Sequence, residues 1–135
     1  MKMFVCGGSL AILLSVLCLS MAGMAGADKD DDGPKIVENL YYSLKDKSIE
    51  AKKKLIDSCK GFLSQQPGIV FFAAGTLADD FKLPFRDRNF DVSLHIVFKN
   101  KAALAKFQDS EGLKKFVEAN KDNWMKVRAF DSEAD

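Results

Sequence analysis

The only histidine of the chain, His95, follows two other polar residues in an alternating stretch. Asp91, Ser93 and His95 occupy every second position, so a strand would present all three on one face. An imidazole near a carboxylate titrates close to neutral pH, which suits acid–base catalysis or metal binding. The alternative, which we favour, is an interface histidine whose nitrogens are satisfied by neighbours or by a second subunit. The sequence predicts neither a metal site nor a cofactor.

One cysteine is a second candidate for chemistry. Cys59 falls on the apolar stripe of a helix expected after Ser48, where a free cysteine packs as a small hydrophobe. A catalytic thiol needs an adjacent base and some exposure, and the sequence around Cys59 supplies neither. We therefore predict that Cys59 belongs to the core.

A polar loop over residues 77–88 carries the third candidate group. Its basic residues are Lys82, Arg86 and Arg88, and its acidic residues stand at positions 79, 80 and 87. Three cations suit an anionic ligand over the mouth of a pocket. The interleaved aspartates favour the alternative interpretation, a solvated loop that neutralises itself.

Periodicity and capping signals predict the elements that must position these groups. Strands are expected over residues 36–44, 69–76, 90–98 and 124–131, and helices are expected after Ser48, Asn100 and Ser110. The order is β-α-β-β-α-β, the ferredoxin-like arrangement of the α+β class. Such a four-stranded antiparallel sheet carries its helices on one face.

Side-chain alternation assigns residues to the two faces of this sheet. In the third strand, Phe90 and every second residue through Phe98 would face the helices, whereas Asp91, Ser93 and His95 would face away. By the same parity, Tyr42 faces the helices. The strand at 69–76 is almost continuously apolar, which is typical of a strand covered on both faces.

The sheet face away from the helices is too apolar to remain in contact with water. On the first strand this face holds Val37, Asn39, Tyr41 and Ser43. A large exposed apolar patch normally marks an interface, and twofold dimers are the commonest assembly. We therefore predict a homodimer in which two such faces meet.

The first 27 residues have the parts of a secretory signal peptide. Lys2 precedes an apolar run that ends in Ala25-Gly26-Ala27, the small residues of a cleavage site. The run is interrupted by glycines and is shorter than the roughly 20 apolar residues of a membrane span. We expect cleavage, with retention as an anchor as the alternative.

The domain organisation follows from this cleavage. We expect a signal peptide over 1–27, a flexible acidic leader over 28–35 and one domain over 36–135. We also expect a bacterial protein that is secreted or periplasmic and has no stable membrane anchor after cleavage. Lys2 is the only charged residue of the signal, so its loss lowers 20 basic residues to 19, equal to the 19 acidic ones. A neutral chain argues against nucleic-acid binding. Cys59 would remain as a lone cysteine, which excludes an internal disulfide.

The mature region resembles the Dabb family, the stress-responsive dimeric α/β barrel domains. The resemblance rests on Leu44-Lys45-Asp46, Pro67-Gly68, the stretch FDVSLHIVFKN, the helix positions Phe107 and Phe116, and the ending KVRAFD. It implies a dimeric α/β barrel and covers nearly the whole domain. These motifs are apolar patterns without a catalytic signature, so they indicate a fold and no activity.

A plant polyketide cyclase of this family uses histidines and a tyrosine in a pocket between sheet and helices. The corresponding positions here hold Glu38, Val92, Phe107 and, on the last helix, Gly112 or Leu113. Of these, only Glu38 carries an ionisable group that could take the place of an imidazole. The resemblance thus implies an apolar pocket, for which the lining candidates are Tyr42, Val92, Phe107 and Leu113.

These observations lead to two main hypotheses about function. The first is an exported homodimeric domain that has no catalytic activity or binds a small apolar molecule. The second is a dimeric-barrel enzyme, a cyclase, lyase or cofactor-free monooxygenase, that uses His95, Asp91 or Glu38. A structural or protein-interaction module is the third alternative.

Overall fold

The strands and helices lie at nearly the residues that the sequence pattern predicted. The computed structural model describes residues 33–135, and the signal peptide and most of the leader lie outside them. The elements are β1 Lys35–Leu44, α1 Ile49–Phe62, β2 Ile69–Thr76, β3 Val92–Phe98, α2 Lys101–Gln108, α3 Glu111–Asn120 and β4 Trp124–Ala134, with a 3₁₀ turn at Lys121–Asn123. No helix among these residues is long and apolar enough to cross a bilayer.

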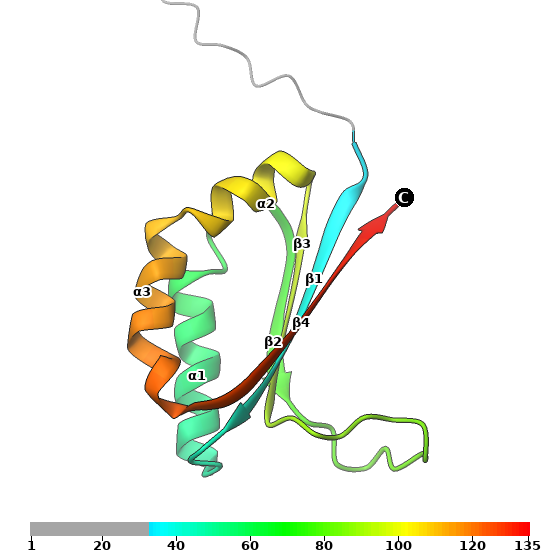
Figure 1. Cartoon of the computed structure of the whole chain (residues 1–135), viewed down its shortest axis with the longest axis vertical. Coiled ribbons are helices and arrows are strands. Elements are labelled where there is room, and N and C mark those ends of the chain that lie inside the picture. The colour runs from blue at the N-terminus through cyan, green and yellow to red at the C-terminus, as the bar shows by residue number, and fades with distance from the viewer. Residues whose placement is uncertain (1–32) are drawn as a thin grey trace, which may run out of the picture.

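The strands form one antiparallel sheet in the order β2-β3-β1-β4. The three helices cover one face of this sheet, and the other face has no covering element in the described residues (Figure 1). This confirms the predicted ferredoxin-like α+β fold. We call the uncovered side the open face and the other the helix side.

The three helices begin at the N-cap residues that the sequence predicted. Ser48 Oγ accepts a hydrogen bond from Ala51 N, Asn100 Oδ1 from Ala103 N, and Ser110 Oγ from Leu113 N. Each bond satisfies one of the amide groups that the first turn of a helix leaves unpaired. After α1, Gly68 turns the chain into β2 with φ of 86°, and a Cβ at this position would stand 2.5 Å from Ala103 Cβ.

The core lies between the helix side of the sheet and the three helices. Its members are apolar: Ile36, Tyr42, Leu44, Leu55, Cys59, Leu63, Val92, Leu94, Ile96, Phe98, Ala103, Phe107 and Phe116. Cys59 is completely buried, as expected. Burial also raises the pKa of its thiol to about 12, so the thiolate needed for nucleophilic chemistry is scarce at neutral pH.

The strand β2, predicted to be covered on both faces, is covered on its helix side alone in the single chain. β2 is an edge strand, and Val70 and Phe71 are more than half exposed. Its apolar run has two causes. Ile69, Phe72 and Ala74 pack against the core, whereas Phe71 pairs in register with Val97 on the open face.

The predicted alternation of the third strand also fails at its start. Phe90 contacts Tyr41 on the open face, with ring centroids 4.9 Å apart. Asp91 is buried, and its Oδ2 accepts a hydrogen bond of 2.9 Å from Leu44 N. Its other oxygen lies 3.5 Å from Lys52 Nζ of α1. The regular strand begins only at Val92, after a bend at Asp91, so neither residue occupies the face that alternation assigned.

Candidate functional site

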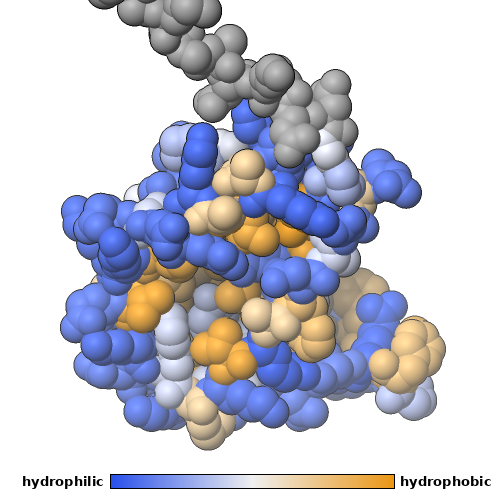
Figure 2. Space-filling model, turned by 45° about the horizontal axis from the view of Figure 1, so that its top comes forward, coloured by the Kyte–Doolittle hydropathy of each residue, from blue (hydrophilic) through white to orange (hydrophobic). Residues whose placement is uncertain are grey.

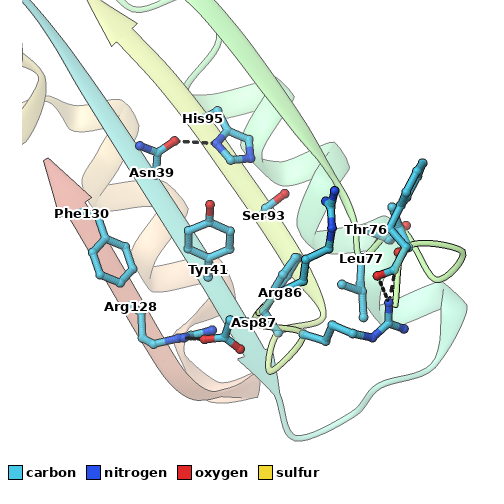
Figure 3. A pocket seen from close by; sticks show the side chains of 14 residues that line it. Asn39, Tyr41, Thr76, Leu77, Arg86, Asp87, Ser93, His95, Arg128 and Phe130 are labelled. Atoms are coloured by element: carbon cyan, nitrogen blue, oxygen red, sulfur yellow. Dashed lines mark hydrogen bonds and ion pairs between the residues drawn. The ribbon is translucent and has the colours of Figure 1, made fainter. Parts of the chain in front are cut away.

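The half of the open face next to the loop after β2, which we call the lower half, contains a cavity of about 660 Å³ between the sheet and this loop. Its floor comes from two cross-strand pairs, Asn39 opposite His95 and Tyr41 opposite Ser93. Figure 3 shows these four side chains projecting from β1 and β3 on the same side of the sheet. The period of two in each strand and the antiparallel register thus create one polar cluster from two distant segments.

His95 is held in one tautomer by its neighbour. Its Nδ1 lies 2.7 Å from Asn39 Oδ1, and because an amide oxygen only accepts, the ring donates from Nδ1. Burial lowers the pKa of His95, so the neutral imidazole predominates at neutral pH. Its Nε2 therefore carries a lone pair and acts as a hydrogen-bond acceptor.

Aromatic rings surround this polar floor. The Tyr41 ring meets those of Phe90, His95 and Phe130 edge to face, at centroid distances of 4.9, 5.8 and 6.1 Å. Within residues 33–135, neither the Tyr41 hydroxyl nor the Ser93 hydroxyl has a hydrogen-bond partner. The cavity thus combines apolar walls with polar groups whose hydrogen-bonding capacity is unused.

Two of the three arginines at the cavity are neutralised by aspartates. Arg88 pairs with Asp79 at 2.9 Å and donates to the carbonyl of Phe81 at 2.9 Å. Arg128 of β4 pairs with Asp87 and donates to the Asn89 carbonyl at 3.1 Å. A backbone hydrogen bond from Asn89, followed by Arg128, lowers the pKa of Asp87, so this pair stays ionised at neutral pH.

The third arginine has no such partner. The Arg86 guanidinium lies over the Phe81 ring, 5.5 Å from its centroid, and within residues 33–135 it forms no ion pair. The loop therefore neutralises itself only in part. Lys82 is exposed and does not line the cavity.

The loop projects from the sheet (Figure 1). Within the loop, Arg88 donates hydrogen bonds to the carbonyls of Ala78, Asp79 and Phe81. Phe81, Leu83 and Phe85 are largely exposed, and Figure 2 shows hydrophobic surface at the lower right, on the side from which the loop projects. We expect Arg88→Ala to increase amide hydrogen exchange across 78–88 by at least about tenfold, because the main side-chain links within the loop are lost.

The effect of Arg88→Ala should be local. The free energy of unfolding should fall by less than about 1 kcal/mol, since the pair with Asp79 is largely solvated. Lys82→Ala, at an exposed neighbouring position that forms no ion pair within residues 33–135, is the matched control and should leave exchange unchanged. Equal exchange in the wild type and the Arg88 variant would contradict this role.

The three catalytic candidates from the sequence lie in three different places. His95 lines the open-face cavity, and Asp91 is bound to Leu44 N and Lys52 at the end of β1. Glu38 lies on the helix side, in register with Asp131 of β4. The structure does not bring them together into one constellation.

Glu38 is nevertheless an unusual acid. Its Oε2 is buried and has no hydrogen-bond partner in the described part of the chain. Burial, and next the nearby Asp131 charge, raise the pKa of Glu38 to about 7. Burial likewise raises the pKa of the adjacent Tyr42 far above its ordinary value, with smaller contributions from Cys59 and Glu38.

We expect Glu38→Gln to stabilise the protein above a pH of about 4.5, with the full gain from about pH 7. Because the folded state keeps the proton that the unfolded state loses above its ordinary pKa of 4.5, stability falls as pH rises from about 4.5 to 7 and then levels off. Glutamine removes this loss. After allowance for partial exposure, the gain at pH 8 should be about 1–2 kcal/mol, and below pH 4.5 it should vanish.

Urea unfolding between pH 4 and 8 measures this difference. Glu50→Gln, which changes an exposed carboxylate in the first turn of α1, is the control and should give no alkaline gain. A gain for Glu38→Gln that is equal at all pH values would mean that packing, and not ionisation, explains it.

The predicted lining residues of a helix-side pocket lie in the core. Tyr42, Val92 and Phe107 are buried, and Leu113 is partly buried against them. None of these four lines the open-face cavity. Among residues 33–135, no three or more histidine, cysteine, aspartate or glutamate side chains are grouped so as to hold a metal ion.

Sequence reasoning missed most of the cavity lining as candidates for binding, including Asn39, Arg128 and Phe130. Their signal is the register, which sets Phe130 opposite Asn39 and Arg128 opposite Tyr41. That register becomes visible only when β1 is known to lie between β3 and β4. Parity alone placed Asn39 on the correct face.

Comparisons with known proteins agree on the family and the fold. The family model described as the stress responsive A/B barrel domain matches residues 40–134. No curated protein gives a significant match. A Dabb family protein with a ferredoxin-like fold from Mesorhizobium loti has a TM-score of 0.62 and 20% identity, over 73% of this chain and 95% of that one.

Two further solved structures are similar in fold at low identity. A dimeric ferredoxin-like protein of unknown function from Thermobifida fusca has a TM-score of 0.62 and 13% identity, over 75% of this chain and 92% of that one. A hydroxynitrile lyase from Passiflora edulis has a TM-score of 0.62 and 15% identity, over 76% and 95%.

Proposed function

Since the chain belongs to the stress responsive A/B barrel (Dabb) family, we propose that it acts as a homodimer that binds a small organic molecule at the open face of its sheet. The observation that carries this proposal is the cavity of about 660 Å³ with unused polar groups on that face. Its volume falls in the range of small-molecule sites, which combine apolar walls with a few polar groups.

The other half of the open face, away from the loop, is apolar, and this supports the proposed dimer. Phe71 of β2 pairs in register with Val97 of β3, which pairs in turn with Val37 of β1. These three side chains form an apolar patch, and Phe71 is 55% exposed in the single chain. A second copy would cover the patch in a twofold interface. The Thermobifida fusca protein with the same fold is described as dimeric.

The two halves of the face have different roles in this proposal. We assign the contact between copies to the apolar half and ligand binding to the polar half, which contains the cavity between the sheet and the loop in the single chain. The helix side is filled by the core, so the apolar ligand pocket expected there receives less support than the open-face cavity. The ligand is therefore expected to have both apolar and polar groups.

An acid–base enzyme is the second candidate function, and Glu38 is the observation in its favour. A carboxyl group with a pKa of about 7 is suited to proton transfer at neutral pH. In such an enzyme the substrate would have to reach the helix side of β1. A ligand seen beside Glu38, and not beside His95, in a crystal structure would support this candidate over the binding domain.

Export of the chain is a separate proposal, which rests on residues 1–27. The intact mass of the protein purified from its own host tests it. Export with cleavage after Ala27 requires a mature chain that begins at Asp28. A chain that retains Met1 to Ala27 would contradict cleavage.

Light scattering coupled to size exclusion, followed by native mass spectrometry, tests the proposed function. We expect twice the mass of one chain at micromolar concentration, together with a bound small molecule in protein purified from its own host. A stable monomer at that concentration would overturn the dimer. Failure of any small molecule to perturb the cavity residues would overturn the binding role.

A further inference from the structure

The walls of the open-face cavity favour a flat aromatic ligand. Tyr41 meets both Phe90 and Phe130 edge to face at the cavity, and Phe81 lines the same cavity from the loop. Aromatic rings gain additional stabilisation from offset or edge-to-face contacts with other rings. An aliphatic group of equal size would fill the same volume without these contacts.

The charges at the cavity favour an anion. Three arginines line it, and two aspartates pair with Arg88 and Arg128. One positive charge therefore remains, on Arg86. The Phe81 ring supports this guanidinium through a cation–π contact but does not neutralise it, so its N–H donors remain available to a carboxylate.

The polar floor favours a ligand that also donates a hydrogen bond. The contact with Asn39 fixes the His95 proton on Nδ1 and leaves Nε2 as an acceptor. The unpartnered hydroxyl groups of Tyr41 and Ser93 can also accept. Figure 3 shows the three side chains on one side of the cavity, with Arg86 on the loop. A ligand that lies between them meets acceptors at one end and a cation at the other.

We infer that the ligand is a small aromatic monoanion whose ring also carries a hydrogen-bond donor. The carboxylate binds Arg86, the ring lies among Tyr41, Phe130 and Phe81, and the donor meets His95 Nε2. This inference rests on the binding function proposed above and names the ligand class of the same site. It adds charge and donor requirements that the volume of the cavity does not impose.

Three matched probes test the inference by titration of ¹⁵N-labelled dimer at pH 7.5. The probe 4-hydroxybenzoate has both features, 4-hydroxybenzamide lacks the charge, and 4-fluorobenzoate lacks the donor. We expect 4-hydroxybenzoate to shift the amide resonances of the cavity residues and to bind at least about fivefold more tightly than either of the others, since each good polar contact contributes about 1 kcal/mol or more.

Two variants test which residue causes the preference for the charge and which causes the preference for the hydrogen-bond donor. Arg86→Gln should remove the preference for the benzoate over the benzamide, and His95→Phe should remove the preference for hydroxyl over fluorine. Lys82→Gln is the control, because it deletes one positive charge from the same loop outside the cavity. It should retain both preferences, whereas a general electrostatic effect would weaken the benzoates equally in both loop variants.

The outcomes separate this inference from the proposed function. If none of the probes shifts a cavity resonance, the small-molecule site itself is contradicted. If all three shift the cavity resonances with equal affinity, the site stands and the ligand class is overturned. Loss of the charge preference in Lys82→Gln as well as in Arg86→Gln would overturn the role of Arg86.

Discussion

Phe71→Asp should separate the proposed dimer into monomers. Phe71 lies on the open face of the edge strand β2, and its register partner Val97 adds to the same apolar patch. A carboxylate at this position would have to leave water without a partner of opposite charge, which strongly disfavours burial. Because a twofold interface contains each position twice, the cost applies in both copies. The dissociation constant should rise by at least about 100-fold.

Sedimentation velocity over a range of concentrations measures this change. Ile49→Asp is the matched control, since Ile49 is 80% exposed at the start of α1 on the helix side. It places the same charge on an exposed apolar residue and should leave the dimer intact. Circular dichroism confirms that both variants are folded. A dimer of Phe71→Asp with unchanged affinity would place the interface elsewhere.

Asp91→Ala should lower the free energy of unfolding by about 2–3 kcal/mol, the range for loss of a buried hydrogen bond to a charged group. The carboxylate accepts from Leu44 N at the end of β1 and lies 3.5 Å from Lys52 Nζ of α1. Alanine leaves the buried amide of Leu44 unsatisfied and removes the link between the sheet and α1. For a domain of this size the melting temperature should fall by about 10–20 °C.

Two companion variants divide this effect between its causes. Asp91→Asn keeps an acceptor oxygen for Leu44 N and loses the charge, so it should cost less than Asp91→Ala. Lys52→Met removes the ion pair alone and, because Lys52 is partly exposed, should cost less than about 1 kcal/mol. Urea unfolding at pH 7 gives all three values. A loss below about 0.5 kcal/mol for Asp91→Ala would contradict the structural role.

Local sequence patterns predicted the elements well because their causes are local. Serine and asparagine caps accept hydrogen bonds from amides three residues away. The alternation of residue types in β3 reflects the burial of every second side chain on one face of the strand. The failures occur where the cause is distant. The bend at Asp91 places its carboxylate against Leu44 N and Lys52. An apolar residue on the open face, such as Phe71, looks the same in sequence as one that faces a helix.

The candidate site was predictable only in part for the same reason. His95 and Tyr41 were assigned to the correct face by parity, yet their shared cavity depends on the register between β1 and its two neighbours. The unpaired charge of Arg86 arises because Asp79 and Asp87 pair with Arg88 and Arg128 instead. Interleaved charges in a loop do not reveal which of them will meet.

The position of β1 between β3 and β4 has a consequence for the order in which the chain folds. Neither neighbour is close in sequence, and β4 follows all the other described elements in chain order. Contacts between distant segments require closure of long loops, which slows folding. During synthesis, β1 has no partner until Val92–Phe98 emerges, and its second edge stays unpaired until Trp124–Ala134 follows. The sheet is therefore completed only after the whole domain has been synthesised.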